Sequence, residues 1–414
     1  MSAELGFLTM DDFDFRGKTV LLRVDFNSPV DPETKKITDD SRIREHAGTV
    51  RELSGKGAKV VILAHQGRPG DPDFIPLEQH ARILGKILKR SVSYINDVFG
   101  ETVINKIKQL RNGGILLLEN VRTYPDETVE KPLAEQAKTP MVKRLAPLAD
   151  VFVNDAFGAA HRAHVSMIGF TGVLPTVAGR VMERELRALI KAAGKPAKPC
   201  VYVLGGAKAK DSVGMAEYIL GRGIADTILT VGLVGNLFLF ARKYDLGSVN
   251  KELLEKRGFI EHLARAEELL TRYGGQVKTP VDIAVDFEGR RSDKSLIELP
   301  TQYYIKDIGK KTTEIFCEII RNAKTIVMNG PAGVFEEKAF LYGTKAILTA
   351  ISKSKGFGMV GGGHTLAVVH ELNLTKKISY VSTAGGALMD YLTGKKLPAV
   401  EALKEAATRY RKGA

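Results

Sequence analysis

Cationic and histidine side chains follow four consecutive runs that resemble buried strands in the first half of the chain. The residues concerned are Arg23, His65 with Arg68, Arg122, and His161 with Arg162 and His164. In an α/β fold the carboxyl ends of parallel strands meet at one sheet edge, and ligands bind there. A single histidine or arginine is more often ordinary surface, but four strand ends of this kind predict a site for a small, multiply charged anion.

Three more polar residues extend the predicted anion site. Arg42 follows Asp39-Asp40-Ser41, a sequence typical of a helix start. The planar guanidinium group suits bidentate contact with a carboxylate or a phosphate. Asp25 and Asn27 stand directly after the first strand run, where they can accept hydrogen bonds from a hydroxyl group on the ligand.

The second half of the chain ends its strand runs in glycine-rich loops instead. These loops cover residues 204–208, 231–232, 329–333, 361–365 and 382–386. Glycine lets the backbone approach a ligand closely, and a loop that opens a helix presents free N–H groups to a phosphate. None of the loops matches G-x-x-x-x-G-K-[ST] or G-x-G-x-x-G. A common P-loop enzyme and a dinucleotide-dependent dehydrogenase are therefore both disfavoured.

Alternating strand and helix patterns must position these loops. Apolar strand runs at 19–26, 59–65, 114–120 and 150–155 alternate with helical patterns, one of them near 132–146. The alternation restarts with runs at 200–206, 226–232, 280–286, 324–331, 356–363 and 378–386. Strands that are apolar on both faces and separated by helices indicate parallel sheets covered on both sides.

We therefore predict an α/β protein with two Rossmann-like parallel-sheet domains and a central cleft. The helical pattern that follows Gly179 and ends at Gly194 would join the two domains. The predicted boundaries are 1–178 with 396–414 for the first domain, 179–195 for the interdomain helix, and 196–395 for the second domain.

Composition limits the class of protein. The 414 residues are 44% hydrophobic and 26% charged, with a formal net charge of +13. A basic excess can indicate nucleic-acid binding, but the chain has no nucleic-acid motif and no long basic block. It has no membrane-length apolar run and no secretion signal, so we expect a cytoplasmic protein. Cys200 and Cys317 lie in apolar runs and are expected to be structural.

Nine motifs, in order from about residue 20 to residue 387, resemble those of the phosphoglycerate kinase family. They are "RVDFNSPV", "DDSRIRE", "AHQGRP", "ENVR", "NDAFGAAHRAHVS", "LGGAKAKDS", "NGPAGVFE", "GGGHT" and "STAGGA". The resemblance implies reversible phosphoryl transfer from 1,3-bisphosphoglycerate to ADP, giving 3-phosphoglycerate and ATP in glycolysis and gluconeogenesis. It also implies Mg²⁺ with the nucleotide, hinge bending between the domains, and no nucleic-acid or membrane partner. We expect a monomer or a small homo-oligomer.

The resemblance also assigns site residues. Phosphoglycerate would be bound by Asp25, Phe26, Asn27, Arg42, His65, Gln66, Gly67, Arg68, Arg122, His161, Arg162 and His164. The nucleotide would be bound by Gly206, Ala207, Lys208, Gly232, Asn329, Pro331, Gly333, Val334, Glu336, Gly361, Gly362, Gly363, His364, Thr365, Gly385 and Gly386. Arg42 and Lys208 would stabilise the charge on the transferred phosphoryl group.

Three positions depart from the family pattern. Ser212 stands where the family usually has a second lysine, and the nearest substitute, Lys210, is expected on the wrong face of its helix. His364 replaces the aspartate that helps to hold the magnesium nucleotide, and imidazole is a poor magnesium ligand. The metal would then be held by nucleotide phosphates and water, or by a carboxylate that the motifs do not identify. The run 230–238, "TVGLVGNLF", matches the family's adenine-side loop only loosely. These departures support an alternative, a catalytically impaired protein that still binds both ligands.

Overall fold

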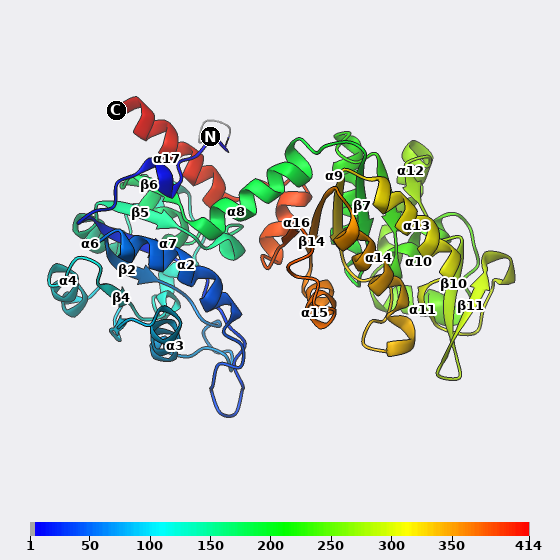
Figure 1. Cartoon of the computed structure of the whole chain (residues 1–414), viewed down its shortest axis with the longest axis horizontal. Coiled ribbons are helices and arrows are strands. Elements are labelled where there is room, and N and C mark those ends of the chain that lie inside the picture. The colour runs from blue at the N-terminus through cyan, green and yellow to red at the C-terminus, as the bar shows by residue number, and fades with distance from the viewer. Residues whose placement is uncertain (1–4, 414) are drawn as a thin grey trace. The chain divides into compact units, whose positions relative to one another are not determined.

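The computed structural model describes residues 5–413, which form two compact units (Figure 1). One unit contains the chain up to Arg187 together with the segment from Lys396 onward, and the other contains Ala188–Lys395. The boundary falls inside helix α8 (Arg180–Leu189), which continues as one π-helical turn to Gly194. No helix within the described range is long and apolar enough to span a membrane.

The first unit contains a six-stranded, fully parallel sheet in the order β3-β4-β2-β1-β5-β6. Its strands are β1 (Thr19–Arg23), β2 (Lys59–Leu63), β3 (Ser93–Tyr94), β4 (Ile115–Leu117), β5 (Val151–Asn154) and β6 (Thr176–Ala178). The helices are α2 (Ser41–Gly55), α3 (Glu78–Leu88), α4 (Glu101–Lys108), α5 (Leu133–Gln136), α6 (Pro140–Leu145), α7 (Val165–Ile168) and α17 (Pro398–Gly413). Six short 3₁₀ segments complete the described part of this unit: Met10–Asp12, Val121–Thr123, Pro125–Thr128, Ala146–Leu148, Phe157–Ala159 and Gly169–Gly172.

Both faces of this sheet are buried, because successive side chains of a strand point to opposite faces. Val20 and Leu22 of β1 pack with α2 and α3 on one face, whereas Leu21 packs with α4 and α6 on the other. Helix α2 supplies a stripe of apolar residues with helical spacing, Ile43, Ala47, Val50 and Leu53. Helix α17 returns from the end of the chain to pack against β6.

The second unit contains another parallel six-stranded sheet, in the order β15-β14-β13-β7-β8-β9. Its strands are β7 (Cys200–Leu204), β8 (Thr227–Thr230), β9 (Val277–Lys278), β13 (Thr325–Asn329), β14 (Phe357–Gly361) and β15 (Tyr380–Val381). The helices are α9 (Ala209–Gly221), α10 (Gly232–Ala241), α11 (Ser248–Lys256), α12 (Leu263–Tyr273), α13 (Lys310–Asn322), α14 (Tyr342–Lys353), α15 (Gly363–Glu371) and α16 (Gly386–Leu392). Two parallel α/β sheets confirm the predicted fold class.

Two local predictions are wrong. The run 280–286 does not join the parallel sheet, because β10 (Asp282–Phe287) pairs antiparallel with β11 (Arg290–Ser295) and β12 (Ile305–Ile308). A two-residue turn, Glu288-Gly289, with positive φ at both positions, makes β10 and β11 a hairpin. The helix predicted near 132–146 is divided into α5 and α6, because Pro140 lacks the N–H needed to continue a helix and instead starts α6.

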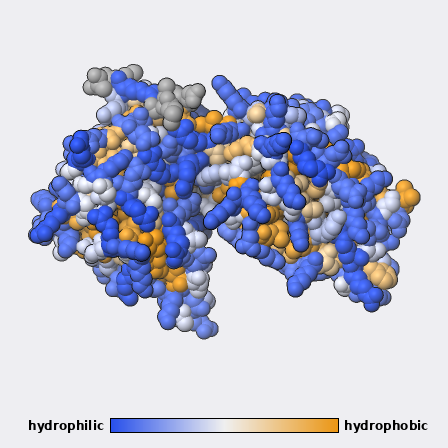
Figure 2. Space-filling view, in the orientation of Figure 1, coloured by the Kyte–Doolittle hydropathy of each residue, from blue (hydrophilic) through white to orange (hydrophobic). Residues whose placement is uncertain are grey.

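The surface is mainly hydrophilic, as expected for a chain in which 26% of the residues are charged. Hydrophilic side chains cover most of the face seen in Figure 2, with apolar side chains in small patches between them. Cys200 and Cys317 are both buried and reduced, as predicted from the apolar runs around them.

Candidate active site

Asp25 and Arg42 lie at the carboxyl end of the first sheet. Arg42 Nη1 donates a hydrogen bond to Asp25 Oδ2, and His65 Nε2 lies 4.0 Å from Asp25 Oδ1. The side chain of Asp25 is 7% exposed and that of Arg42 is 34% exposed, so the guanidinium group reaches solvent above a buried carboxylate. Burial favours the neutral acid, but nearby positive charges, that of Arg42 foremost, outweigh it and lower the pKa of Asp25. Asp25 is therefore ionised and holds Arg42 in place.

The loop that follows β5 lies against this ion pair. A Cβ atom at Gly158 would collide with the Asp25 carboxylate and would come within 3.6 Å of Arg42 Nη1. Only glycine permits this close approach. Further along the same loop, Arg162 Nε lies 3.3 Å from His161 Nε2. The sequence "NDAFGAAHRAH" thus brings its basic residues to the strand end that carries Asp25.

Positive charges in this cluster repel one another. Burial, together with Arg162 and Arg23, lowers the pKa of Arg122 to about 10. Burial and the same kind of repulsion lower the pKa of His164 to about 3. Within the described part of the chain, no carboxylate forms a salt bridge with Arg122 or Arg162. A bound anion would relieve this repulsion, which makes the cluster a suitable site for a polyanion.

Several residues predicted to bind the anion are instead buried beneath the cluster. Phe26 is inaccessible to solvent and stacks on His80, with ring centroids 6.3 Å apart. Gln66 is also inaccessible; its side chain accepts a hydrogen bond from Ser28 N and donates one to Ser28 O. These side chains support the loops after β1 and β2. Their direct contact with a ligand stays a prediction.

The backbone around Gly67 is tied to two other predicted residues. Gly67 N donates to Asn27 Oδ1 at 2.8 Å, and Arg122 Nη1 donates to Gly67 O. Arg68, the next residue, is exposed. The loops after β1, β2 and β4 therefore lie side by side, as expected from the sheet order.

A buried network supports the cluster from below, and the sequence analysis did not identify it. Arg23 is 1% exposed and donates to Ser166 Oγ at 2.7 Å and to His65 Nδ1 at 3.0 Å. Ser166 in turn donates from its backbone N to the fully buried Glu127 at 2.9 Å. Burial and nearby arginines hold the pKa of His65 well below its usual value, so its Nδ1 accepts from Arg23 as a neutral ring. Glu127 lies in the 3₁₀ segment Pro125–Thr128, outside every motif, and Ser166 ends the motif "NDAFGAAHRAHVS" at the start of α7. Nothing in the sequence indicated that these two side chains meet.

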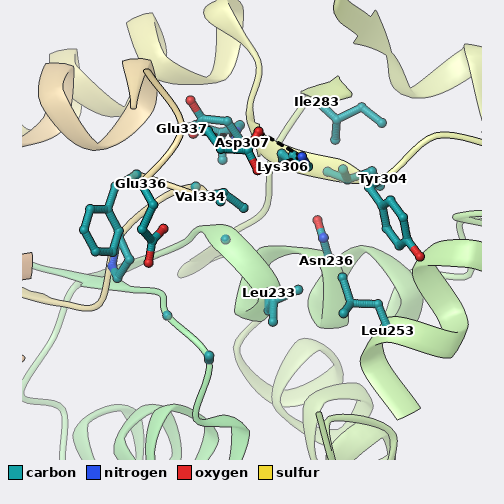
Figure 3. Close-up of a pocket in the computed structure, with 18 of the residues that line it drawn as sticks. Leu233, Asn236, Leu253, Ile283, Tyr304, Lys306, Asp307, Val334, Glu336 and Glu337 are labelled. Atoms are coloured by element: carbon teal, nitrogen blue, oxygen red, sulfur yellow. Dashed lines mark hydrogen bonds and ion pairs between the residues drawn. The ribbon is translucent and has the colours of Figure 1, made fainter. Parts of the chain in front are cut away.

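The second unit has a cavity of about 570 Å³ beside its glycine-rich loops (Figure 3). This volume lies in the range that accommodates small-molecule ligands. Eight of the predicted nucleotide residues line it: Gly206, Ala207, Gly232, Pro331, Gly333, Val334, Glu336 and His364. The other wall comes from α10, α11 and the small antiparallel sheet, through Leu233, Asn236, Leu253, Ile283, Tyr304, Lys306 and Asp307. Leu233 and Asn236 lie in the run 230–238, which matched the family only loosely. The other residues of this wall come from segments far apart in sequence and belong to no motif.

Close backbone packing holds the glycine-rich loops together. Gly206 N donates to Pro331 O at 3.2 Å, and Gly330 N donates to Thr365 Oγ1 at 3.1 Å. Gly330 has φ 88°, and a Cβ atom there would collide with the backbone of Gly205. Because of these contacts, the loops after β7, β13 and β14 form one continuous surface.

The remaining predicted nucleotide residues do not line the cavity. They are Lys208, Asn329, Gly361, Gly362, Gly363, Thr365, Gly385 and Gly386. Lys208 is exposed at the start of α9, and Asn329 ends β13. Gly363 and Gly386 begin α15 and α16. These residues lie at the carboxyl ends of the strands, and their roles stay predictions.

Two of the three departures in this unit, Ser212 and His364, have clear structural consequences. Ser212 is 1% exposed and its Oγ donates to Gly205 O at 3.4 Å, whereas Lys210 is exposed on another face of α9. His364 is exposed at the start of α15, with its ring centroid 5.7 Å from that of Phe335. The described residues contain no group of three or more His, Cys, Asp or Glu side chains placed to hold a metal ion.

Comparison with known proteins identifies the family. The sequence model of phosphoglycerate kinase matches residues 10–395. The chain belongs to the phosphoglycerate kinase family. A phosphoglycerate kinase from Methanobacterium bryantii is 48% identical over 408 residues, which cover 99% of this chain and 100% of that protein. One from Saccharolobus solfataricus is 45% identical over 404 residues, which cover 97% of each chain.

Solved structures agree with this assignment. The crystal structure of phosphoglycerate kinase from Pyrococcus horikoshii has a TM-score of 0.87 and 42% sequence identity, covering 98% of this chain and 100% of that one. The structure from Coxiella burnetii has a TM-score of 0.84 and 34% identity, covering 97% and 100%. The chain is thus a kinase of glycolysis that transfers a phosphoryl group reversibly between 1,3-bisphosphoglycerate and ADP. The comparisons give no support to the alternative of a catalytically impaired binding protein.

Proposed function

We propose that the first unit binds the phosphoglycerate substrate and that the second unit binds the nucleotide. The observation that carries this proposal is the cluster of mutually repelling cations at the carboxyl end of the first sheet. 3-Phosphoglycerate carries a phosphate and a carboxylate, so it supplies the negative charge that this cluster lacks. Arg122, Arg162 and Arg68 would hold the charged groups, and Asp25 and Asn27 would accept from the hydroxyl group.

In the second unit the nucleotide would lie along the cavity. Its base would enter the apolar end, Glu336 would accept hydrogen bonds from the ribose, and the phosphates would extend along Gly206 toward the first turn of α15. The free N–H groups of that turn favour negative charge. Lys208 is exposed at the start of α9, where its ammonium group would meet the transferred phosphoryl group.

Magnesium would enter as part of the nucleotide substrate. His364 occupies the position of the family's aspartate, and the described residues provide no cluster of acidic side chains to replace it. The donor set of this chain therefore does not fit a metal ion held by protein side chains. The nucleotide phosphates and water, which are hard oxygen ligands, suit Mg²⁺ better.

Catalysis would then depend on alignment and charge stabilisation. Phosphoryl transfer needs little covalent participation from the protein. Arg42 is held by the buried carboxylate of Asp25 and needs little reorganisation to stabilise charge on the transferred oxygens. Asp25 thus acts as a positioning residue for Arg42.

A coupled assay tests this assignment. The protein is given 3-phosphoglycerate, ATP and Mg²⁺, and glyceraldehyde-phosphate dehydrogenase with NADH reports the acyl phosphate. Arg42→Ala should lower kcat at least about a hundredfold, the loss typical of a removed transition-state contact. Arg44→Ala is the matched control, because Arg44 lies on the same helix and pairs with Asp40 at the surface. Equal activity of the two variants would contradict the proposed role of Arg42.

We place the reaction in the cytoplasm, which two buried, reduced cysteines suit. We further propose a monomer or a small homo-oligomer, which light scattering of the purified protein would determine.

A further inference from the structure

Asn236 lies on α10 at the wall of the cavity in the second unit. It is 5% exposed, and Figure 3 shows its amide pointing into the cavity, across from Glu336. Its amide makes no hydrogen bond to another described residue, and it is not among the buried polar groups that are shut off from water without a partner. Because the amide opens onto the cavity, water can hydrate it when no ligand is bound, and a ligand can replace that water.

Asn250, a buried asparagine of the neighbouring helix α11, provides the contrast. Its Nδ2 donates to Leu246 O at 2.8 Å and to Tyr303 O at 3.0 Å, and its Oδ1 accepts from Ile305 N at 2.8 Å. Asn250 is therefore a structural residue that joins two segments. Asn236 forms no hydrogen bonds of this kind, so it does not join segments of the fold as Asn250 does.

The other deeply placed polar groups of the cavity are already engaged. Lys306 Nζ lies 2.7 Å from both Asp286 and Glu337. Asp307 accepts from Arg291 at 2.7 Å and from Gly343 N at 2.8 Å. A ligand could use these groups only by breaking ion pairs. Asn236 can form hydrogen bonds with a ligand without that cost.

The surroundings of Asn236 suit a flat ring. Leu233, Leu253 and Ile283 line the same end of the cavity, away from the glycine-rich loops that would take the phosphates. We infer that Asn236 is the base-reading residue of the nucleotide site, with its amide bonded to the six-position edge of a purine. This inference rests on the proposed location of the nucleotide in this cavity.

An asparagine amide carries both a donor and an acceptor. It can accept from the amino group of adenine and donate to the neighbouring ring nitrogen. After rotation by half a turn it can donate to the keto group of guanine and accept from the ring N–H. Asn236 therefore explains why a purine would be favoured, and it predicts that GTP is used within about tenfold of ATP.

The test compares nucleotides that differ only at the base edge. The value of kcat/KM is measured for ATP, GTP and purine riboside triphosphate, which has no substituent at the six position. The wild-type protein should prefer ATP over the purine riboside nucleotide by about tenfold, which is the value of one to two neutral hydrogen bonds. In Asn236→Leu, a replacement of similar volume, this preference should fall to about twofold or less. An unchanged preference would overturn the inference.

Stability provides a second readout, which separates a binding role from a structural one. Without nucleotide, Asn236→Leu should leave the urea midpoint unchanged or raise it, because the amide makes no hydrogen bond to the rest of the described fold. Asn250→Leu, the matched control, should lower the midpoint. A similar loss in both variants would assign Asn236 a structural role and contradict the inference.

A third variant tests the location of the nucleotide itself. Leu233→Trp would fill the cavity from a half-buried position, and the KM for ATP should rise at least about tenfold while the KM for 3-phosphoglycerate stays the same. An unchanged KM for ATP would reject both the location and the inference. A raised KM together with an unchanged base preference in Asn236→Leu would reject the inference alone.

Discussion

His46 Nδ1 lies 2.8 Å from Asp155 Oδ2, and both side chains are buried in the first unit. The other ring nitrogen of His46 accepts a hydrogen bond from Asp25 N at 3.2 Å. The second oxygen of Asp155 accepts from Val181 N at 2.7 Å, in the first turn of α8. The loop that carries Asp25 and the start of α8 are therefore held by the same pair of side chains.

Asp155→Asn tests this pair. Because both oxygens of Asp155 accept hydrogen bonds, the N–H₂ of an asparagine would face the N–H of either His46 or Val181, and one of these contacts is lost. If the N–H₂ faces His46, the ring can accept from it only by changing tautomer, and that change removes the acceptor for Asp25 N. Because the Asp25 loop would lose its fixed position, we expect the KM for 3-phosphoglycerate to rise about tenfold, with an unchanged KM for ATP. Steady-state kinetics with each substrate varied in turn would measure the difference.

The control for this variant is Asp71→Asn, which replaces an exposed aspartate in the loop after β2. It should keep wild-type constants. A rise in both KM values for Asp155→Asn would indicate general damage to the fold and would argue against a specific link to the Asp25 loop.

Lys208 and Lys210 provide a comparison within the first turn of α9. Both are exposed, but Lys208 caps the helix next to the cavity-lining residues Gly206 and Ala207. If its ammonium group stabilises the transferred phosphoryl group, Lys208→Met should lower kcat about a hundredfold or more. Lys210→Met should change kcat less than about twofold, because Lys210 points elsewhere. A large loss for Lys210→Met would show that it replaces the lysine missing at position 212.

The two parallel sheets could be predicted because each strand is recognisable from the pattern of apolar residues in its own segment of the sequence. Strands such as β1 and β7 are apolar on both faces and are followed by amphipathic helices, which predicts a covered parallel sheet. The run 280–286 has the same composition, but its pairing partner is set by the turn at Glu288-Gly289 and by β12, which is distant in sequence. The composition of the run therefore does not show whether it pairs with the parallel sheet or with an antiparallel neighbour.

The candidate site could be predicted only in part, for a related reason. Arg42 and Glu336 belong to continuous motifs, so their neighbourhoods are visible in the sequence. The apolar end of the cavity is built from α10, α11 and β10, and only its α10 residues fall in a run, 230–238, that resembled the family at all. Glu127 and Ser166 are likewise 39 positions apart and meet only in the folded chain. Contacts of this kind depend on packing between distant segments.

Acid should destabilise the protein through buried histidines, of which His80 is the clearest. Burial lowers the pKa of His80 from 6.5 to about 4. The folded state therefore binds fewer protons than the unfolded state between these values. The stabilisation is fully present above pH 6.5 and is lost as the pH falls toward 4. Between pH 7 and pH 5, His80 alone should reduce the free energy of unfolding by about 2 kcal/mol.

Urea unfolding at pH 7 and pH 5 would measure this effect. His80→Gln can keep a hydrogen bond to Gln66, which His80 Nε2 makes at 3.1 Å, but it does not titrate. The variant should therefore lose less stability on acidification than the wild-type protein. His370→Gln, at an exposed histidine, should behave like the wild type. Parallel losses in all three proteins would assign the acid sensitivity to other groups.

Substrate binding should change the solution shape of the protein. We propose that the two substrates bind to different units, and direct transfer requires the acceptor oxygen within about 3.5 Å of the phosphorus. The two ligands together should therefore hold the units in a closed arrangement that excludes water. Small-angle scattering should show a smaller radius of gyration with 3-phosphoglycerate and a non-hydrolysable ATP analogue together than with either ligand alone. In Arg42→Ala the compaction should be weaker, because one charged contact with the transferred group is missing. A radius of gyration that stays the same in all ligand states would contradict closure, and the proposed division of the substrates between the units would then have to be abandoned.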